Sequence, residues 1–189
     1  MAGGIEFNRG KFKELVLFFA DESAKARDEG FGMVKLNKLL FRADFEAYRL
    51  LGRSITGETY EKQEFGPVAR DLPIVLDELG RAGRLDWRNI PRGRRMRKVP
   101  FVRQGLEARP DVTSFTSDEL RIIKRTLSEL ATHGGKSVSD WSHEQSAGWN
   151  VMPHYGDEID YATTFISTDP VPDEDLKRAT AFVHENGWV

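Results

Sequence analysis

The chain has 189 residues, of which 39% are hydrophobic and 31% charged, and its net charge is −2 at pH 7. This length and composition predict one folded domain and exclude a disordered tail. The chain contains no cysteine, which excludes disulfides and thiolate metal sites and favours a cytoplasmic protein.

No stretch of the sequence has the apolar length of a transmembrane helix. The strongest apolar run, Leu15 to Ala20, is far shorter than the roughly 20 residues that cross a bilayer. Met1 to Gly10 has no basic segment followed by a long apolar run. We therefore expect no membrane insertion.

Apolar residues at helical spacing predict two long helices near the start of the chain. The first runs from about Arg9 to Glu29, and the second follows Gly30 and Gly32 and ends at Gly52. The residues expected in the core are Phe12, Leu15, Val16, Phe19, Leu36, Leu39, Leu40, Ala43 and Ala47.

The middle of the chain predicts a short strand, a third helix and a hairpin. The helical period is lost from Thr59 to Glu64, and Gly66-Pro67 then breaks the chain. Because proline is tolerated only in the first turn of a helix, Pro73 places the start of the third helix near Asp71. Arg84 to Gln104 has the pattern of a hairpin with a basic tip.

Three further helices are expected in the last third. Thr116 to Glu119 forms a capping box and opens a helix that continues to Gly134. Ser137 or Ser139 opens a short helix that carries Trp141 and His143. The last helix, Pro172 to Asn186, is expected to turn an apolar set inward, which consists of Leu176, Ala179, Phe182 and Val183. Together the elements predict a single helical domain that is mainly α with a small antiparallel β-sheet or hairpin (α+β).

Charge is distributed unevenly along the sequence. Arg81 to Arg103 holds nine bases and one acid, and Tyr155 to Val189 holds eight acids and two bases, so their net charges are near +8 and −6. Such separation indicates partners or internal docking. The basic residues near the hairpin tip are candidates for partner binding: Arg92, Arg94, Arg95, Arg97 and Lys98.

Several catalytic motifs are approached but not completed. Gly135-Lys136-Ser137 lacks the first glycine of a phosphate loop, and His143-Glu144 lacks the second histidine of a zinc-protease helix. Gly52-Arg53-Ser54 fails the spacing of a nucleophile elbow. We therefore expect no enzymatic activity, no cofactor and no metal.

Two ordered motifs resemble a known family. Lys35 to Phe41, followed by Ala43-Asp44-Phe45, and then Ser54 to Tyr60 with Phe65-Gly66-Pro67-Val68, resemble the two signatures of the Panacea or SocA-like antitoxin domain. A later segment, Trp141-Ser142-His143 to Trp149, resembles the C-terminal part of that family. The signature residues are Leu36, Leu39, Leu40, Tyr60, Gly66, Pro67, Trp141, His143 and Trp149.

The resemblance implies an antitoxin domain over residues 1–150 and leaves an acidic helical extension over residues 151–189, which we expect to pack on the same domain. It implies that the protein neutralises a cognate toxin by direct binding, and some relatives look like adaptors that deliver the toxin to a Clp-type protease. Which of these modes applies, the identity of the toxin and the oligomeric state stay open.

Three cations of the second helix are further candidates for partner binding. Lys35 and Lys38 lie on one helical face, where they either meet acids of a partner or, as the simpler interpretation, are solvated. Arg42 occupies a position that is often aromatic in the family.

A DNA-binding regulator of winged-helix type is the alternative function. The basic hairpin tip could neutralise the phosphates of operator DNA, as a wing does. The predicted order of elements differs from that of a winged helix, which has a strand between its first two helices. The isoelectric point near 6.1 also disfavours a dedicated DNA binder.

Overall fold

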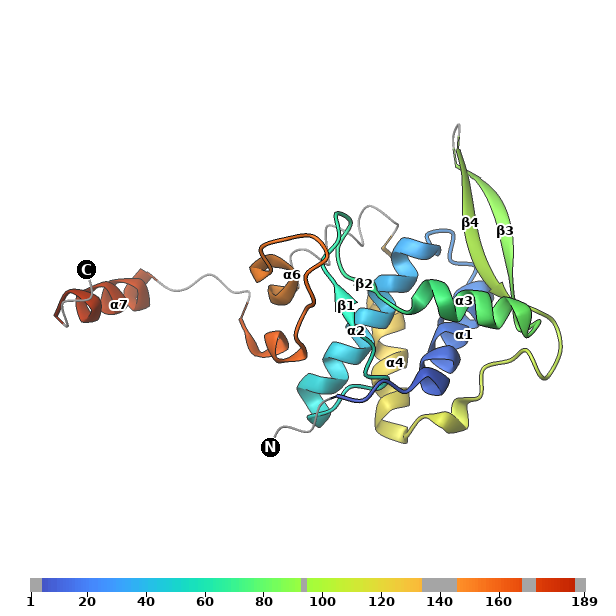
Figure 1. Cartoon of the computed structure of the whole chain (residues 1–189), viewed down its shortest axis with the longest axis horizontal. Coiled ribbons are helices and arrows are strands. Elements are labelled where there is room, and N and C mark those ends of the chain that lie inside the picture. Colours follow the sequence, from blue (N-terminus) through green and yellow to red (C-terminus); the bar gives the residue numbers. More distant parts are fainter. Residues whose placement is uncertain (1–4, 93–94, 134–145, 168–172, 186–189) are drawn as a thin grey trace.

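Helix α1 (Arg9–Lys25) and helix α2 (Met33–Leu51) form the centre of the fold. In the computed structural model, which describes residues 5–92, 95–133, 146–167 and 173–185, α1 packs on α2 and α2 packs on α4 (Ser117–Leu130). Helix α3 (Leu72–Arg81) lies against α1 (Figure 1). The predicted core is confirmed, since the following residues are all buried: Phe12, Leu15, Val16, Phe19, Leu36, Leu39, Leu40, Ala43 and Ala47.

Helix α1 ends four residues before the predicted Glu29. Arg27 adopts a left-handed conformation with φ of 54°, and its amide donates to the Ala24 carbonyl at 3.1 Å. The Asp28 amide donates to the Ser23 carbonyl at 2.9 Å. This is the double hydrogen bond of a Schellman cap, with arginine in the place that glycine usually takes. Helix α2 ends at Gly52, which has φ of 70°, as predicted.

The segment between α2 and α3 contains two short strands where one was expected. Strand β1 (Tyr60–Glu61) pairs antiparallel with β2 (Val68–Ala69), and the turn between them passes through Gly66 with φ of 95°. Helix α3 begins after Asp71 with proline in its first turn, so the predicted start is confirmed.

The predicted hairpin is formed by β3 (Leu85–Arg92) and β4 (Arg95–Val102). Its register runs from Leu85 opposite Val102 to Arg92 opposite Arg95. Strand β4 packs on α1 and β3 packs on α3, whereas the far end of the hairpin projects from the helices (Figure 1). We call β3 and β4 together the hairpin arm.

The C-terminal third begins with η1 (Val112–Ser114), and α4 follows with the predicted capping box between Thr116 and Glu119. Helix α4 ends at Leu130 and not at Gly134, since the His133 amide closes a turn on the Leu130 carbonyl. The short helices α6 (Ala147–Val151) and η2 (Tyr161–Phe165) come next. The predicted helix with Trp141 and His143 falls within 134–145, outside the described residues.

Helix α7 (Asp173–Glu185) matches the predicted last helix within a residue at each end. Phe182, predicted to face inward, is 54% exposed, so that prediction is wrong for this residue. Figure 1 draws α7 apart from the other helices, and packing of residues 151–189 on the domain stays a prediction. Within the described ranges, no helix is both long and apolar enough to cross a membrane. The mainly α architecture with two small antiparallel sheets among the described residues confirms the predicted fold class.

Candidate functional site

The polar residues of the two sequence motifs are joined to each other inside the molecule. Asp44 of α2 is fully buried, and its carboxylate accepts hydrogen bonds from the Thr56 amide at 2.8 Å, the Thr56 hydroxyl at 2.5 Å and the Tyr60 hydroxyl at 2.8 Å. Burial raises the pKa of Asp44 to about 6, although the hydrogen bonds from Thr56 and Tyr60 oppose this shift. The motif in α2 thus positions the segment that leads into β1.

Two other polar residues of α2, Asn37 and Lys38, hold the turn that follows β1. The Lys38 ammonium donates to the Pro67 carbonyl at 2.9 Å, and the Asn37 side-chain oxygen accepts from the Ala69 amide at 2.9 Å. Lys38 is 1% exposed, and burial lowers its pKa to about 7. The expectation that Lys38 is solvated is wrong, because the turn at Gly66-Pro67 covers it and supplies its acceptor.

Lys35 is buried as well, so its predicted solvation is also wrong. Its ammonium pairs with Asp28 at 2.6 Å and donates to the carbonyls of Ala131 and His133 at 3.2 and 2.9 Å. A buried ammonium requires such acceptors because an uncompensated charge is costly in the interior. Lys35 therefore ties the start of α2 to the loop after α1 and to the end of α4.

Arg42 and Trp149 also make contacts within the chain. The Arg42 guanidinium lies 3.6 Å from Glu46 and 3.5 Å from Glu129 of α4. The Trp149 indole donates to the Gln63 carbonyl at 2.9 Å. Leu36, Leu39, Leu40 and Tyr60 belong to the core. The motif residues that the structure describes are therefore framework, and they bring α2, the β1–β2 turn and α6 together.

The hairpin arm presents two different faces. Residues that alternate along its strands share a face, and directly opposite residues share it too. The outer face carries Trp87, Asn89, Pro91, Met96 and Lys98 beyond a buried base. The inner face carries Arg88, Ile90, Arg97, Val99 and Phe101 and turns toward the end of α1.

The outer face combines exposed apolar side chains with a cation. Trp87 is 39% exposed and Met96 is 61% exposed, and Lys98 is exposed between them on the strand pair. Only the charges of this segment are predicted from the sequence as binding features. The alternation of Leu85 and Trp87 in β3 is the signal in the sequence for an apolar face that continues from the base to the exposed part of the arm.

Two of the five predicted hairpin cations have described side chains. The Arg97 guanidinium donates to the Glu29 carbonyl at 2.6 Å, which anchors the inner face on the α1–α2 loop. Lys98 is exposed. Arg94 and the side chains of Arg92 and Arg95 lie outside the described part, as do Trp141 and His143.

The described residues do not form a metal centre. Among the residues that the structure covers, no three or more His, Asp or Glu side chains are placed to hold a metal ion. The buried carboxylate of Asp44 and the buried ammonium of Lys38 face partners of the chain itself.

Comparison with known proteins gives one match. The family model for the antitoxin SocA-like, Panacea domain matches residues 36–150, which is more than half of the chain. Neither a curated protein nor a solved structure matches. The matched range begins at Leu36, the second residue of the first motif, includes the second motif and the hairpin arm, and ends just after Trp149. The chain belongs to the family of SocA-like antitoxins that contain the Panacea domain.

Proposed function

We propose that the chain neutralises a toxin protein by binding it directly, with the outer face of the hairpin arm as the main contact. The observation that carries this proposal is an arm that projects from the helices and exposes Trp87, Pro91 and Met96 beside Lys98 (Figure 1). Aromatic residues and methionine are enriched in the centres of protein interfaces. Membership of an antitoxin family supports a binding role.

The edges of the arm favour contact through side chains. The Arg103 amide donates to the Arg84 carbonyl at 3.0 Å, which makes these opposite residues a hydrogen-bonded position of the ladder. Hydrogen-bonded and non-hydrogen-bonded positions alternate along an antiparallel pair, so Pro91 and Pro100 occupy non-hydrogen-bonded positions and direct their backbone nitrogens toward the open edges. Proline has no amide hydrogen, and each open edge has therefore lost one donor. A partner strand would meet an interrupted edge on either side. The toxin is expected to lie on the face of the arm and not to extend its sheet.

The charge of the arm defines the kind of surface that fits it. Lys98 lies on the outer face, and Arg88 and Arg97 lie on the inner face. An apolar patch bordered by acidic residues on the toxin would match this pattern. Charges at the border mainly increase the rate of association and select against wrong partners.

Direct binding is the first step of both modes of neutralisation. A toxin held on the arm is blocked if the arm covers its active surface, or it is delivered if a Clp-type protease then takes the complex. Measuring toxin half-life in cells with and without that protease separates the two modes.

Operator DNA is the second candidate ligand, and the order of elements speaks against it. Residues 26–32, which join α1 to α2, contain no strand, whereas a winged helix has one there. Arg97 is also engaged with the Glu29 carbonyl. Tight duplex binding that weakens steeply with salt would favour this alternative.

The test is growth rescue together with affinity measurement. Each open reading frame that neighbours the gene is co-expressed with the chain as a candidate toxin, and the complex is titrated by calorimetry. A variant with Trp87→Ser and Met96→Ser should bind at least tenfold more weakly and rescue growth poorly, because interface centres lose about 1.4 kcal/mol or more on truncation. Leu106→Ser is the matched control, since Leu106 is an equally apolar residue, 81% exposed, that lies off the arm. Equal affinity of the two variants would refute the proposed contact.

A further inference from the structure

A cleft lies at the elbow between the hairpin arm and the helices. Its volume is about 260 Å³, and it is bounded by the end of α1, the loop that follows α1 and the inner face of the arm. The apolar part of its wall consists of Ala20, Ala24, Phe31, Ile90, Val99, Pro100 and Phe101. These residues come from three separate segments, so the cleft exists only when the arm is seated on α1.

Two guanidinium groups border this apolar wall. Arg88 stacks on Phe101, with 4.2 Å between the guanidinium carbon and the ring centre, and this contact holds its charge at the cleft. Arg27, exposed in its left-handed conformation, is the second cation in the lining. Neither Arg88 nor Arg27 forms an ion pair with another described residue.

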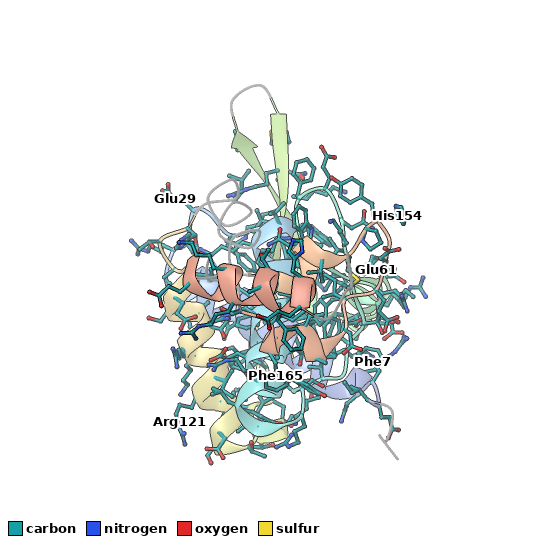
Figure 2. The ribbon with its side chains drawn as sticks, turned by 90° about the vertical axis from the view of Figure 1, so that its left-hand side faces the viewer. Phe7, Glu29, Glu61, Arg121, His154 and Phe165 are labelled. Atoms are coloured by element: carbon teal, nitrogen blue, oxygen red, sulfur yellow. The ribbon has the colours of Figure 1, made fainter. Side chains whose placement is uncertain are left out.

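Two acids, Asp28 and Glu29, also line the cleft. Asp86 pairs with Arg103 at 3.4 Å, and Asp28 pairs with the buried Lys35 at 2.6 Å. Glu29 is exposed and lies at the outer margin of the molecule (Figure 2). Because Asp28 is engaged by Lys35, the lining sets two guanidinium groups against the single carboxylate of Glu29, and this excess of positive charge favours a carboxylate from outside.

A buried hydroxyl in the lining gives an independent indication of a ligand. Ser23 is 1% exposed, and among the described residues its hydroxyl oxygen has no hydrogen-bond partner. A buried polar group without a partner is costly and uncommon in folded proteins. Ser23 lines the elbow cleft and also a neighbouring pocket bordered by Leu127 and Ala131, and a polar ligand atom in the elbow cleft would satisfy its hydroxyl.

We infer that the elbow cleft binds an apolar side chain flanked by a carboxylate, presented by an acidic and aromatic segment of the protein partner. The apolar side chain fills the space between α1 and the inner face, the carboxylate meets Arg88 and Arg27, and Ser23 bonds the backbone of the segment. This inference rests on the proposed function, since it specifies what the bound protein inserts beside the arm.

Short peptides test the chemistry of the cleft without any toxin. The probes are N-acetylated, C-amidated Glu-Phe-Glu, Lys-Phe-Lys and Glu-Ser-Glu, and the readout is the amide chemical shifts of the isotope-labelled full chain. Glu-Phe-Glu should shift the amides of Ser23, Phe31 and Arg88 saturably, and the other two peptides should bind at least fivefold more weakly. Equal binding of all three probes, or shifts located elsewhere, would overturn the inference.

Variants of exposed residues locate the binding. Ala24→Phe fills the cleft and should abolish the shifts, whereas Ala181→Phe makes the same change on α7 and should leave them unchanged. Arg88→Gln should weaken binding at least fivefold, and Arg121→Gln, which removes an exposed cation from α4, should not. Loss of binding in both members of a pair would also overturn the inference.

Toxin capture by the same variants separates this inference from the proposed function. If wild type and Ala24→Phe capture the toxin equally well, direct binding stands and the inferred role of the cleft is refuted. If Ala24→Phe captures it at least tenfold more weakly, the inference is supported. If wild type captures no toxin, the proposed function fails, and selective binding of Glu-Phe-Glu by the cleft then supports the recognition chemistry alone.

Discussion

Replacing Lys38 by methionine is expected to remove a rise in stability with pH. Burial lowers the pKa of Lys38 from 10.5 to about 7, so between pH 7 and 9 the unfolded chain holds a proton that the folded chain releases. The free energy of unfolding then increases with pH. Each proton released on folding adds about 1.4 kcal/mol to the free energy of unfolding per pH unit. Because folded Lys38 is half protonated at pH 7, the free energy of unfolding increases by about 2 kcal/mol between pH 7 and pH 9.

The assay is urea unfolding at pH 7, 8 and 9, followed by tryptophan fluorescence. Lys38→Met should be less stable at every pH, because the buried Pro67 carbonyl loses its donor, at a cost of about 1–3 kcal/mol. The difference between wild type and variant should widen by about 2 kcal/mol over this range. Lys124→Met, on the exposed face of α4, is the control and should follow wild type. Parallel pH profiles for wild type and Lys38→Met would refute the assignment of this titration to the buried ammonium.

Three further predictions concern the arm, the end of α1 and the contact between α6 and η2. Replacing Arg94, Arg95 and Arg97 by serine should slow the association of the toxin and reduce the salt dependence of its rate, while the melting temperature falls by at most a few degrees. The rates are measured by stopped-flow fluorescence, and unchanged rates would contradict a role of these charges in steering the toxin. Arg27→Gly should raise the free energy of unfolding by about 1 kcal/mol, because the left-handed conformation is unfavourable for a side chain with a Cβ; a loss of stability in urea would contradict this. Gly148→Ala should lower the melting temperature by several degrees, because the added Cβ would collide with side chains at and just before η2. The melting temperature is measured by calorimetry, and an unchanged value would show that these side chains move away freely.

Local patterns predicted the helical core well because the information for it is local. The spacing of Leu36, Leu39 and Leu40 alone identifies the buried side of α2, and the capping box at Thr116 fixes the start of α4. The end of α1 was misplaced because the cap at Arg27 uses a conformation for which glycine is the usual signal.

The burial of Lys35 and Lys38 in α2 cannot be predicted from local sequence, because their environment is made by distant parts of the chain. Their acceptors are the carbonyls of Pro67 for Lys38 and of Ala131 and His133 for Lys35, which no pattern within α2 contains. Charge was read as a sign of the surface, and that rule fails where a backbone turn supplies the missing acceptors.

The candidate binding surface was predicted in part. The hairpin and its basic character followed from residues 84–104, but the apolar outer face of Trp87 and Met96 required the register of the two strands. The elbow cleft could not be predicted at all, because Ala24 and Phe101 meet only after the hairpin has packed on α1.

The closure of the hairpin arm at its base has a consequence for protein engineering. The arm leaves the helices at Arg84 and returns at Arg103, and a backbone hydrogen bond of 3.0 Å joins these two residues. All pairing between β3 and β4 lies beyond this point. Exchanging residues 85–102 between two antitoxins of this family therefore replaces one whole, internally paired unit through two adjacent junctions. The framework made by the motif residues of α2 and the β1–β2 turn would remain intact, and if the toxin binds on the arm as proposed, such chimaeras exchange the toxin specificity of one antitoxin for that of another.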